Sequence, residues 1–231
     1  MSAALPQLPI LSRVVSASSL PTTRSGAPTW GLSDLAGRLV ELSAGDRSAH
    51  LTAAFGLVLD AQLGGESAAW VTLEHSSFFP PDVADGGVDL DVLPVVRVPN
   101  VRMAGRAADH LVQSGGFGLV VIDISDTSSF SDIQGKQKIA AERIRCTHKI
   151  SVPLLTRLLG QARQRNVAVL FLTKKSSEGP SLHSLISLRV EAQWERQQEG
   201  QYKLSIHALK DKRGERGWIH VEMCRGPAGL R

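Results

Sequence analysis

The stretch VELSAGDRSAHLTAAF, residues 40–55, has the setting in which proteins bind phosphate. An apolar run ends near Leu42, and after a short polar turn an apolar stripe at helical spacing runs from Leu51 to Leu59. A strand, a tight turn and a helix form a phosphate-binding loop when the turn carries G-x-x-x-x-G-K-[ST]. The glycines let backbone N–H groups cradle phosphate, the Lys reaches the β- and γ-phosphates, and the hydroxyl holds Mg²⁺. Because this stretch lacks that Lys and that hydroxyl, it is either a nucleotide site or the remains of one.

Composition narrows the class of protein. The 231 residues are 42% hydrophobic and 21% charged, which favours one globular domain with a short tail. Apolar runs are far shorter than the roughly 20 residues that cross a bilayer, and Pro6 and Pro9 interrupt the N-terminal apolar residues, so we expect neither a membrane partner nor a signal peptide. The two cysteines, Cys146 and Cys224, are far apart in sequence, which fits a cytoplasmic protein without a metal site.

The elements that must position this loop alternate along the chain. Apolar patterning predicts strands at about 38–43, 68–74, 93–98, 119–124 and 167–173. Helices are predicted at about 47–62, 102–114, 134–148 and 152–165, and final strands at 187–195, 202–209 and 217–222. This order favours an α/β fold with a mostly parallel twisted sheet flanked by helices and an antiparallel C-terminal extension. Residues 1–28, rich in Pro, Ser, Ala and Thr, are expected to be a flexible arm or linker, which leaves 29–231 as the core domain.

Several segments, in order, resemble the core of the RecA recombinase family. They are GRLVEL (37–42), LEHSSFFPP (73–81), GVDLDVL (87–93), SGGFGLVVID (114–123), VAVLFLT (167–173) and LKDKRGERGW (209–218). The resemblance implies a RecA-like core, but no residues follow Arg231 to form RecA's C-terminal domain, and the second DNA-binding loop is shorter than RecA's. A core of this kind with an altered phosphate loop resembles the ImuA group of RecA paralogues, which overlap in sequence with SulA-like division inhibitors.

Matched through GRLVEL, the phosphate loop has lost the residues that hold phosphate. Its positions are occupied by Ala44, Gly45, Asp46, Arg47, Ser48, Ala49, His50 and Leu51. Alanine replaces both glycines of the motif, His50 replaces the lysine and Leu51 replaces the hydroxyl. An ordinary histidine, with a pKa of about 6.5, is shorter than lysine and mostly neutral at pH 7. We therefore expect no cofactor and no efficient ATP hydrolysis, while Arg47 and the helix N-terminus leave binding of ATP with Mg²⁺ open.

The resemblance also assigns roles to residues outside the loop. It places Glu74 where the family positions the attacking water, and Asp123 at the Walker B position that holds Mg²⁺. The alternative is that Glu74 is an ordinary polar residue at a strand end and Asp123 a turn residue. Lys210 and Lys212 match the basic pair that reaches a neighbouring subunit's nucleotide in RecA filaments, and the alternative for them is a solvated hairpin.

Basic residues also gather where the family has its two DNA-binding loops. These residues are Lys136, Lys138, Arg143 and Arg145 in the first region, and Lys174 and Lys175 in the second. Contacts with the phosphate backbone need little more than charge, so weak, sequence-independent binding of single-stranded DNA is one hypothesis. A solvated basic surface is the other, because aromatic residues for stacking bases are lacking near either cluster.

The resemblance therefore implies an accessory protein of the bacterial DNA-damage (SOS) response. In that interpretation the protein acts with RecA and an ImuB-like error-prone polymerase subunit in translesion synthesis and induced mutagenesis, by docking, in the cytoplasm and near the nucleoid. Two alternatives belong to other classes of function. One is a DNA-stimulated ATPase that uses Arg47 or His50 in place of lysine, and the other is a SulA-like cell-division inhibitor.

Overall fold

The computed structural model describes residues 30–45, 48–74, 76, 80–125, 150–197, 201–214 and 217–225. Its elements are α1 (Leu32–Leu35), β1 (Leu39–Ala44), α2 (His50–Leu63), β2 (Ala68–Leu73), α3 (Pro80–Asp85), β3 (Val95–Val98), α4 (Val101–Ser114), β4 (Leu119–Asp123), α6 (Val152–Arg165), β5 (Ala168–Lys174), β6 (Leu188–Arg196), β7 (Gln201–Asp211) and β8 (Ile219–Arg225). The predicted arm, 1–28, and the predicted helix, 134–148, lie outside the described residues.

The strands form one mixed sheet in the order β3-β2-β4-β5-β1-β6-β7-β8. The strands from β3 to β6 pair in parallel, and β7 and β8 then add antiparallel pairs. This arrangement confirms the α/β prediction of a mostly parallel sheet with an antiparallel C-terminal extension. The strand β6 is the joint between the two parts, because it runs parallel to β1 and antiparallel to β7.

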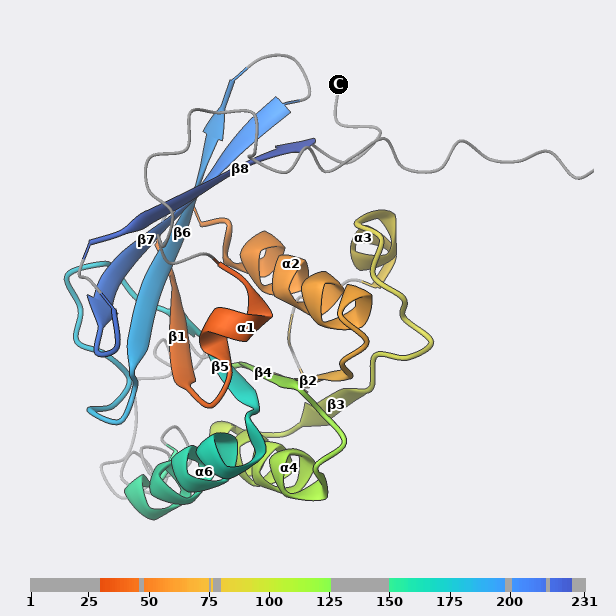
Figure 1. The fold of residues 1–231 in the computed structure, drawn as a ribbon, viewed down its shortest axis with the longest axis vertical. Helices are drawn as coiled ribbons and strands as arrows, with labels where there is room; N and C mark the ends of the chain where they lie inside the picture. Colours follow the sequence, from red (N-terminus) through yellow and green to blue (C-terminus); the bar gives the residue numbers. More distant parts are fainter. Residues whose placement is uncertain are drawn as a thin grey trace, which may run out of the picture.

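Helices cover both faces of the parallel part of the sheet (Figure 1). The helices α1 and α2 pack on one face, and α4 and α6 lie side by side on the other. Each central strand therefore has apolar neighbours on both sides, which explains why LVVID and AVLFLT are almost wholly apolar. In the described part of the chain, no helix is long and apolar enough to span a membrane.

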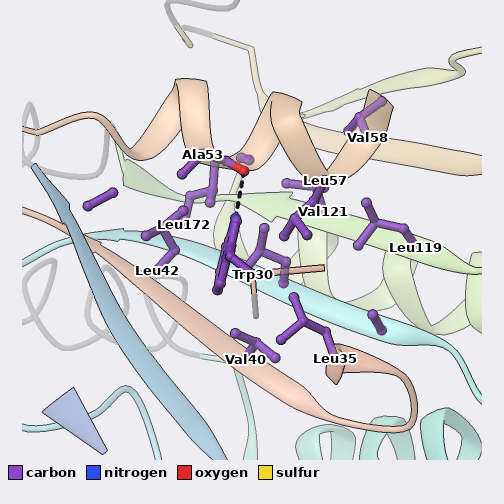
Figure 2. Packing of buried hydrophobic residues seen from close by; sticks show 14 of the residues in the cluster. Trp30, Leu35, Val40, Leu42, Ala53, Leu57, Val58, Leu119, Val121 and Leu172 are labelled. Carbon is purple, nitrogen blue, oxygen red and sulfur yellow. Dashed lines mark hydrogen bonds between the residues drawn. The ribbon is translucent and has the colours of Figure 1, made fainter. Parts of the chain in front are cut away.

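The first described residue, Trp30, closes the core beneath α2 (Figure 2). Its side chain is buried among residues of β1, α1 and α2, and its Nε1–H donates to the backbone oxygen of Ala53 at 3.0 Å. The backbone N–H of Leu32 donates to Asp60 Oδ2 at 2.7 Å. These two bonds fix the chain that enters β1 against the helix that leaves the phosphate loop.

Element boundaries differ from the sequence prediction in three places. The helix expected from residue 47 begins at His50, because Ser48 and Ala49 are drawn into contacts with β6. The helices α1 and α3, of four and six residues, were not predicted because such short helices show no apolar period. The last strands, β7 and β8, extend through Asp211 and Arg225, beyond their predicted ends.

Candidate phosphate-loop site at the carboxyl edge of the sheet

The carboxyl ends of β1, β2 and β4 bring the predicted nucleotide residues to one edge of the sheet. Gly45 follows β1, Glu74 follows β2, and Asp123 ends β4. Because β4 pairs with β2 and only β5 separates it from β1, the three strand ends are near neighbours. Ligands of parallel α/β sheets bind in the crevice outside such strand ends, so the topology of a nucleotide site is present.

The described part of the loop is closed against β6. Ser48 forms an isolated antiparallel bridge with Gln193, and the Ala49 N–H donates to the Ala192 oxygen at 3.0 Å. The His50 N–H donates to Ser48 Oγ at 3.2 Å, and Ser48 Oγ lies 2.8 Å from His50 Nδ1. Two backbone N–H groups of the described loop residues, those of Ala49 and His50, are thus bonded within the protein.

A buried carboxylate stands beside the loop. Glu191, on β6, is 7% exposed, and a methyl carbon placed on Gly45 would lie 2.5 Å from Glu191 Oε1. Gln193 Nε2 donates to the other oxygen, Oε2, at 3.3 Å. Because a phosphate at this point would meet a buried negative charge, Glu191 opposes binding of a nucleotide.

The carboxylate at the Walker B position accepts hydrogen bonds from other residues of the protein. Asp123 is 3% exposed, and its Oδ1 accepts bonds from the Ser125 N–H at 3.1 Å and from Ser125 Oγ at 2.7 Å. Its Oδ2 accepts a bond from Ser76 Oγ at 3.4 Å. Glu74 is exposed in the turn after β2, where its N–H donates to the Val98 oxygen at 3.1 Å. Asp123 therefore terminates β4 as a turn residue, and Glu74 is accessible at the edge.

Several of these residues differ from those that hold MgATP in a phosphate loop. Position 50 offers histidine in place of lysine, position 51 offers leucine in place of a hydroxyl, and Glu191 adds a buried negative charge. Asp46 and Arg47, the remaining loop residues of the prediction, lie outside the described residues. The assignment of the described loop positions and of the Walker B position to a nucleotide site stays a prediction. These positions are Ala44, Gly45, Ser48, Ala49, His50, Leu51 and Asp123.

A second carboxylate that the sequence analysis missed organises the region of the predicted second DNA-binding loop. Glu41, fully buried on β1, accepts bonds from Thr173 Oγ1 at 2.9 Å, Lys175 Nζ at 3.0 Å and the Leu182 N–H at 2.7 Å. The first two bonds reach Oε1 and the third reaches Oε2. Lys175, predicted to bind DNA, is therefore held in an ion pair, while Lys174 is exposed.

We term residues 175–187 the 175–187 segment. Basic side chains donate hydrogen bonds to several of its residues. The buried Arg189 guanidinium donates to the backbone oxygens of Ser176 and Gly179, and its Nε donates to Ser43 Oγ on β1 at 2.9 Å. The predicted inter-subunit pair also acts here, because Lys212 Nζ donates to the Ser184 oxygen and Lys210 Nζ to Ser181 Oγ. The structure thus brings Lys175, Lys210 and Lys212 together around one segment.

Positively charged side chains gather around Lys210. The pKa of Lys210 lies below its usual value because of burial and because Lys212 and Arg189 are close, although the Glu41 carboxylate acts in the opposite direction. Three charged side chains thus shift the pKa of Lys210. Lys212 and Arg189 lower it, and Glu41 raises it. The other predicted DNA-binding residues, Lys136, Lys138, Arg143 and Arg145, lie outside the described residues.

A buried ion pair joins the start of β1 to the end of β7. Arg38 NH2 and Asp211 Oδ1 are 2.5 Å apart, and both side chains are almost fully buried. Burial opposes the charge of Asp211, but bonds from the Arg213 N–H, from Arg38 and from Trp218 Nε1 outweigh it and hold the pKa of Asp211 below its usual value. This pair holds the end of β7, where Lys210 lies, close to the residue that precedes β1, with β6 between the two strands.

Comparison with known proteins identifies the family of this arrangement. The model of the RecA N-terminal domain matches residues 23–177, which run from before β1 through β5. The chain is similar to Protein RecA of Corynebacterium urealyticum, 34% identical over 138 residues, and to Protein RecA of Leifsonia xyli subsp. xyli, 30% identical over 140 residues. It is also similar to Protein RecA of Acinetobacter baumannii, 26% identical over 139 residues.

These alignments cover about three-fifths of this chain but a smaller share of the relatives. The matched parts are 59%, 60% and 60% of this chain and 34%, 38% and 39% of the three RecA proteins. The chain therefore spans well under half of the length of the curated relatives that it matches. The range matched by the family model, 23–177, contains β1, the ends of β2 and β4 with Glu74 and Asp123, and β5.

Proposed function

This chain belongs to the RecA N-terminal domain family, and we propose that it works as an accessory protein that docks without hydrolysing ATP. In this proposal it resembles the ImuA group and acts with RecA and an ImuB-like polymerase subunit in translesion synthesis and induced mutagenesis. Docking on one end of a RecA filament would cap it and redirect it from recombination to lesion bypass.

The closed phosphate loop is the observation that carries this proposal. The Ala49 N–H is bonded to β6, the His50 N–H is bonded to Ser48, and Glu191 lies against Gly45. Opening the loop for phosphate would break the bond to Ala192 and bring two negative charges together. We therefore infer that this family member keeps the sheet topology of the core for contact with partners, while Ala49 and His50 of the loop are bonded within the protein.

Loss of nucleotide binding is tested by calorimetry. We expect titration of the chain with MgATP, with and without single-stranded DNA, to show no binding tighter than about 100 μM, which corresponds to roughly −5.5 kcal/mol. A functional RecA protein serves as the positive control for nucleotide and DNA quality. Binding tighter than that limit would contradict the proposal that the loop is structural.

Docking is tested separately with RecA. We expect the purified chain to be retained by immobilised RecA and to inhibit RecA-promoted strand exchange at substoichiometric amounts, because capping needs one molecule per filament end. Retention by an ImuB-like subunit is the second docking test. No retention by RecA together with unchanged strand exchange would overturn the role as a RecA partner.

A weak DNA-stimulated ATPase is the second candidate, and one observation favours it. Glu74 and Asp123 still stand at the adjacent carboxyl ends of β2 and β4, where a water-positioning group and a metal-facing carboxylate would be needed. If MgATP binds, hydrolysis should be abolished in Glu74→Gln and unchanged in Glu66→Gln, a matched change at an exposed glutamate before β2. Hydrolysis that survives Glu74→Gln would contradict the proposed role of Glu74.

A further inference from the structure

The helices α4 and α6 carry the excess positive charge of the chain. Each helix has 14 residues, and together the two helices contain five arginines and one aspartate, with neither lysine nor glutamate. The whole chain has 26 Lys and Arg against 22 Asp and Glu, so the remainder is balanced at 21 of each. The net charge of +4 therefore equals the charge on these two helices, which form a single layer on one face of the sheet (Figure 1).

The two arginines of α4 lie on its solvent-exposed side. Its apolar and small residues Val101, Ala104, Gly105, Ala108 and Val112 are buried, while Arg102, Met103, Arg106 and His110 are exposed. Because 102, 106 and 110 are spaced by four, they form a row along one side of the helix. The start of α6 adds Val152, which is 53% exposed.

The seam between the two helices is close and fixed. A methyl carbon on Gly105 would lie 2.9 Å from Leu154 Cδ2 and 3.2 Å from Ile150 Cγ2, so glycine allows the close approach. Across the seam Arg157 donates through Nε and NH2 to both oxygens of the buried Asp109, yet the Arg157 side chain stays 53% exposed. Asp109, the one aspartate of the two helices, is thus paired with Arg157 between them. The arginine row therefore lies on a helix that is packed closely against its neighbour.

One arginine of the row runs against what helix stability alone would select. Arg102 lies in the first turn of α4, near the positive end of the helix dipole, where acidic residues are favourable. By contrast, Arg163 and Arg165 lie in the last turn of α6, where the dipole favours them, and Arg165 NH1 lies beside Gly115. Arg163 and Arg165 therefore have a structural explanation, and Arg102 does not. Local rules broken without structural gain mark functional surfaces.

We propose that Arg102, Arg106 and Arg157, together with the exposed Met103 and Val152 of the same two helices, form a docking surface for an acidic segment of a partner protein. Arginine and methionine are enriched in protein interfaces and lysine is depleted, which matches this composition. Binding to a nucleic-acid backbone uses lysine and arginine alike, and single strands also need aromatic platforms, which the exposed residues of α4 and α6 do not include. The proposal stands independently of the phosphate loop, which lies at the end of β1.

The test uses the full chain and a fluorescent peptide of alternating Glu-Glu and Leu-Leu pairs. We expect the chain to bind this peptide, and the double variant Arg102→Ala/Arg106→Ala to bind it about tenfold more weakly. The matched control is Arg163→Ala/Arg196→Ala, which removes two exposed arginines outside the row and should leave the affinity unchanged. Thermal unfolding should show the first variant to be as stable as the wild type or more so, because it removes cations from a helix N-terminus.

Three results would overturn the proposal. One is equal loss of affinity in both double variants, which would indicate a general charge effect. Another is tighter binding to an oligothymidine of equal charge than to the peptide, lost in Arg102→Ala/Arg106→Ala, which would identify a nucleic-acid surface. The third is the absence of peptide binding by the wild-type chain at low salt.

Discussion

At the scale of single residues, two buried glutamates determine the surroundings of the loops at the end of β1 and after β5. Glu191 places a negative charge where a phosphate would lie, and Glu41 binds Lys175 and the Leu182 N–H. Both carboxylates are buried, and a buried charge is stable only when it is paired or hydrogen-bonded. Glu41 meets this condition with three donors, which makes it a structural residue of the 175–187 segment.

The buried pair of Arg38 and Asp211 gives the fold a dependence on pH. Because the pKa of Asp211 is lowered in the folded chain, its stabilising effect is present above the unfolded pKa of about 3.9 and is lost as the pH falls through the folded value. We expect Asp211→Asn to lower the free energy of unfolding by roughly 3 kcal/mol at pH 7, with the difference shrinking below about pH 4. Urea denaturation of both proteins across this range measures it.

The control for this prediction is Asp91→Asn, at an exposed turn residue. It should change the free energy of unfolding little at any pH, because exposed charges contribute little. A difference between wild type and Asp211→Asn that stays constant down to pH 3 would contradict the assignment of the titration to Asp211.

At the scale of elements, the two parallel helices on the arginine-bearing face begin in different ways. The Asn100 side chain accepts a bond from the Met103 N–H at 3.0 Å, which caps α4. Ser151 precedes α6 with extended backbone angles but makes no side-chain cap bond, and a proline stands in its first turn. We expect Asn100→Ala to cost about 1 kcal/mol and Ser151→Ala close to nothing. Equal losses in denaturant titrations would show that the difference between the caps has no energetic consequence.

Most elements, but few of their interactions, could be predicted from the sequence. The helix 152–165 was predicted with the observed bounds, since its apolar period and its proline near the start are local signals. The loop after β1 was located in the same way, by a strand, a turn and a helix. Glu191 and Arg189 were missed because they lie beside Gly45 and Ser43 only through the pairing of β1 with β6, nearly 150 residues apart in the chain. Apolar periods do not predict the order of strands in a sheet. The contacts between the loop and β6 could therefore not be predicted either.

At the scale of the whole molecule, the sheet is held together at its joint by polar contacts as well as by its core. The 175–187 segment connects β5 to β6, and Glu41, Arg189 and Lys212 hold it from β1, β6 and the end of β7. Because these contacts are ionic or polar, removal of one partner leaves a buried group unsatisfied, which costs more than the bond itself contributes. The 175–187 segment therefore couples the parallel and antiparallel parts of the sheet, and Glu41 holds it from the parallel part.

Glu41→Gln tests this coupling. The change keeps the size of the side chain but removes the charge that Lys175 and the segment use, so we expect a loss of about 3 kcal/mol in unfolding free energy. We also expect faster cleavage by trypsin after Lys174 and Lys175, because release of the segment exposes that backbone. Glu195→Gln is the matched control, since Glu195 forms an exposed ion pair with Lys203 and should change neither quantity. If both variants resist trypsin like the wild type, the segment is held by its other contacts, and Glu41 serves β1 and β5 alone through Thr173.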